Sequence, residues 1–235
     1  MSEQPPTNPL SSALASGDDF VRNIMVTSDG NVPPTTVLIM TLVKYGGNGL
    51  YTYPVVWQKS IPFVPKVLTP WPIVYRNQFA FGRPKVEDNK IAGSLATVTI
   101  NKGQSTELHT DGKGAYSFTT PVPAGEGFEN MIVAQNDCPL LENITISVSN
   151  GLGFEPVEIW TSTGSGSELV SEFQPILYIR GWVDPKVSAS AGQILPDDGP
   201  GDLLWSADPL SLKPTTALQL TYDITKLALV LKQTP

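Results

Sequence analysis

Two segments near the middle of the chain combine residue types that could hold a sugar. Trp160 stands two positions after Glu158, and Tyr178, Arg180 and Trp182 follow one another at the same spacing. Successive side chains of a β-strand point to opposite faces, so residues two apart share a face. Aromatic rings can stack on the apolar face of a sugar while polar neighbours bond to its hydroxyl groups. The same mixture suits a protein partner, because Trp, Tyr and Arg dominate interface hot spots.

The stretch from residue 153 to 182 is predicted to form a hairpin of two strands joined by a flexible loop. Alternation assigns one outer face to six candidate ligand-binding residues: Glu158, Trp160, Glu172, Tyr178, Arg180 and Trp182. A bulge at Pro175 would shift this register. Residues 61–72, residues 185–209 or a second subunit could instead cover this face. The hairpin resembles in outline those of small β-sandwich lectins and cytolysins made without signal peptides, although it contains no motif specific to either.

Residues for catalysis or for a transition-metal site are scarce. His109 is the single histidine and Cys138 the single cysteine, so a site built from several such ligands cannot form. Both are expected to be inert, His109 at an exposed turn and Cys138 in the core. The candidate metal ligands are three aspartates of a Gly/Pro loop, which could hold calcium: Asp197, Asp198 and Asp202. No other cofactor is expected, and neither is enzymatic activity.

The composition excludes several classes of partner. The net charge is −7, which argues against nucleic acid and against a basic surface for anionic lipid. One cysteine cannot form an intramolecular disulfide, which favours a reducing compartment. Neither a signal peptide nor an apolar run long enough to span a membrane is recognisable. We therefore expect a cytoplasmic protein, or one exported without a classical signal peptide.

The elements that would position these residues are strands. The chain has 20 glycines and 22 prolines, and only 16% of its residues are charged. Short apolar or alternating runs recur between turn signals, including residues 36–43, 73–81, 94–101, 143–150 and the hairpin 106–120. In residues 143–150, Ile144 and Ile146 alternate with Thr145 and Ser147. The expected fold is all-β, an antiparallel β-sandwich of jelly-roll-like or related type with little or no helix.

One domain is expected over residues 20–235, after a flexible arm at residues 1–19, with a candidate subdivision at 87–92. The favoured function is non-enzymatic binding, lectin-like, of glycan or another surface, by a homo-oligomer. Two alternatives remain open. Ser/Thr-rich hairpins such as 106–120 would suit a membrane-active, pore-forming toxin, and the N-terminal arm would suit an assembly protein with a self-interface.

Overall fold

The computed structural model describes residues 19–42, 52–63, 70–171, 176–196 and 199–234, and it confirms the all-β class. Three sheets contain every named strand. The largest has eight strands in the order β17-β16-β1-β5-β11-β12-β3, with β6 paired to β5. Its members are β1 (Val21–Ser28), β3 (Thr52–Pro54), β5 (Trp71–Glu87), β6 (Lys90–Ile100), β11 (Glu142–Ser149), β12 (Phe154–Thr163), β16 (Thr215–Asp223) and β17 (Ala228–Gln233).

The other two sheets are smaller. A five-stranded sheet comprises β7 (Gln104–Thr110), β8 (Tyr116–Phe118), β9 (Val122–Pro123), β10 (Ile132–Asn136) and β13 (Glu168–Ser171). A four-stranded sheet comprises β2 (Val37–Thr41), β4 (Gln58–Lys59), β14 (Leu177–Trp182) and β15 (Asp202–Ala207). The helical element among the described residues is one 3-10 turn at Pro209–Ser211. Most strand pairs are antiparallel, but β1 with β16 and β7 with β10 are parallel.

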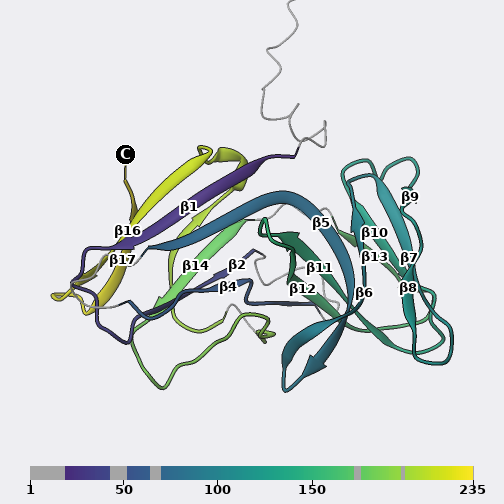
Figure 1. Cartoon of the computed structure of the whole chain (residues 1–235), viewed down its shortest axis with the longest axis horizontal. Coiled ribbons are helices and arrows are strands. Elements are labelled where there is room, and N and C mark those ends of the chain that lie inside the picture. Colours follow the sequence, from purple (N-terminus) through teal and green to yellow (C-terminus); the bar gives the residue numbers. More distant parts are fainter. Residues whose placement is uncertain (1–18, 43–51, 64–69, 172–175, 197–198, 235) are drawn as a thin grey trace, which may run out of the picture.

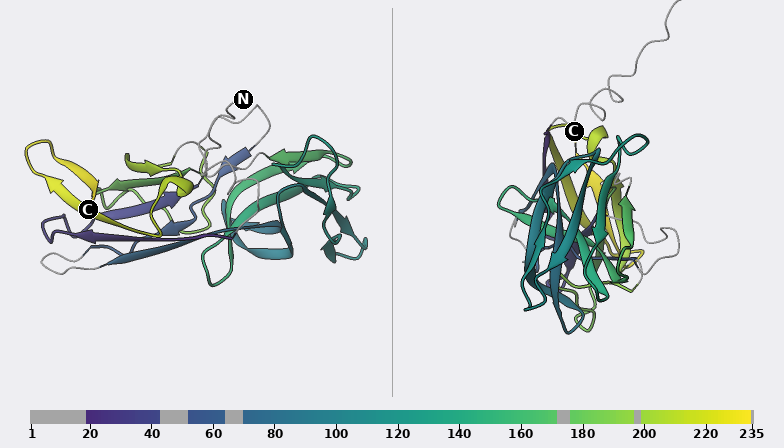
Figure 2. Two further views of the ribbon diagram at one scale, coloured as in Figure 1. Left: turned by 90° about the horizontal axis from the view of Figure 1, so that it is seen from above. Right: turned by 90° about the vertical axis from the view of Figure 1, so that its right-hand side faces the viewer.

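The molecule is elongated, and β5 runs along much of it (Figures 1 and 2). The four-stranded sheet lies toward one end, with β1, β16 and β17, and the five-stranded sheet lies at the other. The first residues of β5 pair with β1, its middle pairs with β11, and its last nine pair with β6. The eight-stranded sheet curls into half a barrel around this last part.

A tight turn joins β5 to β6. Asp88 and Asn89 both have positive φ, 48° and 58°, which is the conformation of a two-residue hairpin turn that matches the strand twist. Residues 87–92, the candidate subdivision, therefore reverse the chain within one sheet.

The main hydrophobic core is built by residues of all three sheets, among them Ile24, Leu38, Tyr75, Ile146 and Leu177. β11 is buried on both faces, because its apolar side chains face this core while Thr145 and Ser147 face the inside of the half-barrel. The predicted hairpin at 106–120 is confirmed as β7 and β8.

A buried ion pair lies within the eight-stranded sheet, at its contact with the five-stranded sheet. The guanidinium of Arg83 on β5 donates from Nε to the carboxylate of Glu142 on β11, at 2.9 Å, and Glu142 is only 4% exposed. The same guanidinium lies 4.3 Å from the centre of the Tyr116 ring on β8. One cation thus connects strands of both sheets.

Candidate ligand-binding pocket

The predicted hairpin at 153–182 does not form. β12 pairs with β11 and β3, β13 pairs with β10, and β14 pairs with β2 and β15. Trp160 and Trp182 consequently lie in different sheets and share no face. The prediction was wrong because neighbours in sequence were assumed to be neighbours in the sheet, whereas here each strand pairs with distant segments.

Trp160 belongs to the main core and is 9% exposed. Its ring centre lies 6.5 Å from that of Phe81, and its backbone pairs with Ile144. The face assignment failed because of a bulge in β12: Ile146 pairs with Glu158 but Ser147 with Pro156, so Val157 is an extra residue. Beyond the bulge, Trp160 follows Ile144 toward the core.

Trp182 is covered by the chain itself. It is 7% exposed, and its indole Nε1 donates to the carbonyl of Val187 at 2.9 Å. Ala189 and Leu195 pack beside it. From the sequence, three segments or partners could cover this face. For Trp182, the covering residues come from the range 185–209. Neither tryptophan presents a ring to a ligand.

The remaining candidates do not assemble a site. Tyr178 and Arg180 are half-exposed on β14, and Arg180 donates to the carbonyl of Gly201 at 3.3 Å. Asp202 is exposed at the start of β15. Three other candidates lie outside the described residues: Glu172, Asp197 and Asp198. Within the described ranges, no group of three or more His, Cys, Asp or Glu could hold a metal ion.

His109 lies between two carboxylates. Its Nδ1 is 2.9 Å from Asp137 and its Nε2 is 3.3 Å from Glu107, so both ring nitrogens are engaged. Cys138 is buried, and burial raises the pKa of its thiol, which keeps it protonated and unreactive.

The pocket arises where a strap closes the curled sheet. The strap comprises residues 191–195 and bonds through its backbone to both open sides of the half-barrel. On one side, Ile91 donates to Gly192 and Ile194 donates to Asn89, at 2.9 and 3.0 Å. On the other, Leu195 donates to Pro54 at 2.9 Å. The strap therefore links the β5–β6 turn to β3.

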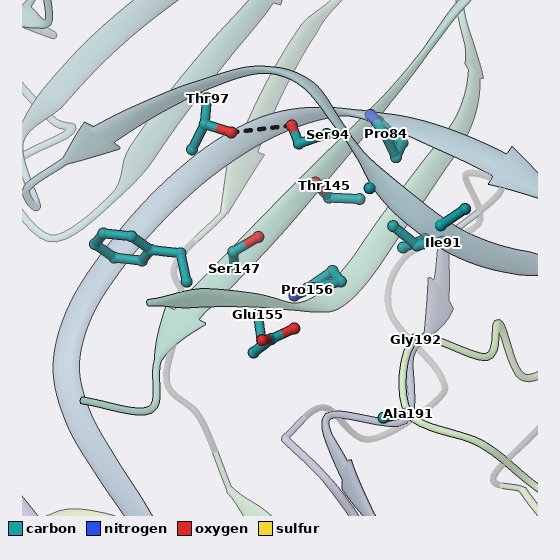
Figure 3. Close-up of a pocket in the computed structure, with 13 residues that line it drawn as sticks. Pro84, Ile91, Ser94, Thr97, Thr145, Ser147, Glu155, Pro156, Ala191 and Gly192 are labelled. Atoms are coloured by element: carbon teal, nitrogen blue, oxygen red, sulfur yellow. Dashed lines mark hydrogen bonds between the residues drawn. The ribbon is translucent and has the colours of Figure 1, made fainter. Parts of the chain in front are cut away.

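A cavity of about 220 Å³ lies inside this closed ring. Figure 3 shows that its walls come from β5, β6, β11, β12 and the strap. Thirteen residues line it: Pro84, Ile91, Ala92, Gly93, Ser94, Thr97, Thr145, Ser147, Phe154, Glu155, Pro156, Ala191 and Gly192.

Small side chains and bulges keep this space open. The lining includes Gly93, Gly192, Ala92 and Ala191, which leave room that larger side chains would fill. Besides Val157 in β12, β6 has extra residues at Ala92 and Leu95. Bulges bend strands and redirect side chains, and they are frequent next to functional sites.

Glycine is required at one close approach in the strap. Gly192 has φ +80°, and a Cβ there would lie 2.9 Å from the carbonyl oxygen of Ile91. Any other residue would strain the backbone and collide with β6. Gly93 differs, because its φ is ordinary and a Cβ would meet no atom within 4 Å.

Hydroxyl groups give the cavity its polarity. Thr145 Oγ1 donates to the carbonyl of Gly82 at 3.2 Å, and Thr97 Oγ1 donates to Ser94 Oγ at 2.9 Å (Figure 3). Ser147 adds a fourth hydroxyl group. Glu155 is the one ionisable residue of the lining, and partial burial raises its pKa. The cavity can therefore form hydrogen bonds with a small polar molecule.

Sequence reasoning missed this site, although a signal for it existed. The alternation of Ile144 and Ile146 with Thr145 and Ser147 is visible in the sequence, but it does not show what covers the hydroxyl side. Both hydroxyl residues are in fact buried, at 3% and 6% exposure. Only the strap, which is far away in the sequence, turns that surface into the inside of a pocket.

Comparisons with protein-family models, with curated proteins and with solved structures found no match. Among the described residues there is no helix of the length and apolar character needed to cross a membrane.

Proposed function

We propose that this chain is a non-enzymatic, lectin-like binding protein that takes one sugar residue of a glycan into the pocket of the half-barrel. The observation that carries the proposal is the lining itself. Four side-chain hydroxyl groups border a cavity that is also bounded by apolar groups of Pro84, Ile91 and Phe154. A sugar ring has the matching surface, with hydroxyl groups at its edge and C–H groups on its faces.

The size of the cavity supports a single ring. Pockets for drug-sized ligands have about 300–1,000 Å³, whereas this cavity has about 220 Å³. The backbone bonds of the strap support a preformed site, which reduces the entropy lost on binding. The proposal keeps the binding class expected from the sequence and moves the site from the buried tryptophans to the hydroxyl groups.

The test is a glycan-array screen followed by titration calorimetry of any ligand found. Thr97→Phe should abolish binding, because the side chain of Thr97 borders the cavity and the larger ring would fill it from an exposed strand position (Figure 3). Leu95→Phe is the matched control, since Leu95 lies on the same strand, is 49% exposed and does not line the pocket. Its affinity should stay within twofold of the parent.

A blank array would contradict the proposal, and so would equal affinity of the parent and the Thr97→Phe variant. Far-ultraviolet circular dichroism of both variants checks that the fold is retained. Dye release from liposomes by the unmodified protein, with a blank array, would favour the pore-forming alternative instead.

A further inference from the structure

The direction of the hydrogen bonds in the pocket carries information about its ligand. A carbonyl oxygen can only accept, so a hydroxyl group bonded to a carbonyl must donate its single proton there. Thr145 Oγ1 bonds to the carbonyl of Gly82 at 3.2 Å. The proton of Thr145 is therefore committed to the protein, and only its oxygen lone pairs remain for a ligand.

The direction of the hydrogen bonds can be assigned in the same way for Ser94 and Thr97 on β6. Ser94 Oγ lies 2.6 Å from the carbonyl of Ala96 and 3.2 Å from that of Arg83, so its proton goes to a carbonyl. The bond between Ser94 and Thr97 must then be donated by Thr97. Three of the four hydroxyl groups thus offer acceptors and no protons.

The charges of the lining point the same way. None of the thirteen residues is Lys, Arg or His, and the carboxyl group of the ionisable one, Glu155, lies on the face of β12 opposite to Pro156, because Glu155 pairs with Val148. An anionic ligand would meet lone pairs and no cation. A ligand rich in donors would satisfy the acceptors and gain the stronger hydrogen bonds that a charged donor makes.

We propose that the preferred ligand of the pocket is a sugar that carries a free ammonium group, with the hydroxyl oxygens of Ser94, Thr97 and Thr145 as acceptors. This inference rests on the proposed function and specifies its substrate class. The net charge of −7 adds a long-range attraction for a cationic ligand. Neutral sugars bind more weakly, and uronic acids are rejected.

The experiment compares glucosamine, glucose, N-acetylglucosamine and glucuronic acid by ligand-observed NMR and calorimetry at one ionic strength. Glucosamine should bind at least tenfold more tightly than glucose, and glucuronic acid should not bind.

A pair of variants tests the acceptors. Thr97→Val keeps the β-branched shape on an exposed strand position but removes the oxygen, so glucosamine affinity should fall several-fold. Thr99→Val, on the same strand and outside the lining, should not change it.

The outcomes separate the two proposals. Equal affinity for glucose and glucosamine overturns the inference and leaves the sugar-binding function in place. Absence of binding by all four sugars overturns both.

Discussion

Glu158 is the residue whose chemistry fits its surroundings least. It lies on the core side of β12, paired with Ile146, and burial alone raises the pKa of its carboxyl group from 4.5 to about 7. No charged neighbour offsets this shift. The folded state therefore holds the proton of Glu158 more tightly than the unfolded state does.

This shift predicts a pH-dependent stability. A carboxyl group with a raised pKa favours folding below pH 4.5, and that contribution is lost as the pH rises from 4.5 to 7. The whole difference is at most about 3 kcal/mol. Glu158→Gln should therefore increase the free energy of unfolding at pH 8 by about 1–3 kcal/mol and change it little at pH 4.

Urea denaturation at the two pH values measures the effect. Glu168→Gln is the control, because Glu168 is exposed on β13 and should show no such difference between pH 4 and pH 8. An equal effect of Glu158→Gln at both pH values would contradict the assigned burial.

At the scale of elements, the strap at 191–195 decides whether the half-barrel encloses a pocket. Gly192→Ala should lower the free energy of unfolding by about 1–3 kcal/mol, because alanine is strained at φ +80° and its Cβ would lie 2.9 Å from Ile91. Gly93→Ala has open space and an ordinary φ, so it should be neutral. Thermal unfolding of the two variants provides the comparison.

Loss of ligand affinity should accompany the loss of stability in Gly192→Ala, because the strap is a wall of the site. Full stability together with full affinity in this variant would show that the strap can adjust without cost.

Elements with local signals were predicted well. The β7–β8 turn is encoded by Asp111 and its glycines, and β11 by its alternating residues, so both appear where the sequence places them. The pairing of β12 with β3 and of β14 with β2 has no local signal, because it depends on contacts between residues about a hundred or more positions apart. The bulge at Val157 then reversed the face of Trp160. A binding function could be proposed from the composition, but the position of the candidate site could not.

At the scale of the whole molecule, Arg83 links the two sheets that meet at β5: it pairs with Glu142 inside the eight-stranded sheet and lies over Tyr116 of the five-stranded one. Glu142→Gln should lower the free energy of unfolding by about 3 kcal/mol, because it leaves the largely buried guanidinium of Arg83 without its counter-charge. Glu87→Gln is the matched control, since it removes an exposed ion pair with Lys85 and should have no measurable effect.

The same experiment tests whether the described chain behaves as one domain. Tryptophan fluorescence, which reports on Trp160 and Trp57 in the common core, and far-ultraviolet circular dichroism should give coincident urea transitions. Two separate transitions would show that the five-stranded sheet unfolds on its own.

The strap also determines when, during folding, the cavity becomes enclosed. Asn89 Nδ2 donates to the carbonyl of Ile194 across 105 residues of chain, so the ring around the cavity closes only after the intervening sheet has formed. Contacts between such distant residues form slowly. On the ribosome, the β5–β6 hairpin emerges about a hundred residues before its closing partner, and the hydroxyl face stays open to water in the meantime. The proposed sugar binding therefore requires the complete fold, and a nascent chain that ends before the strap should bind no sugar.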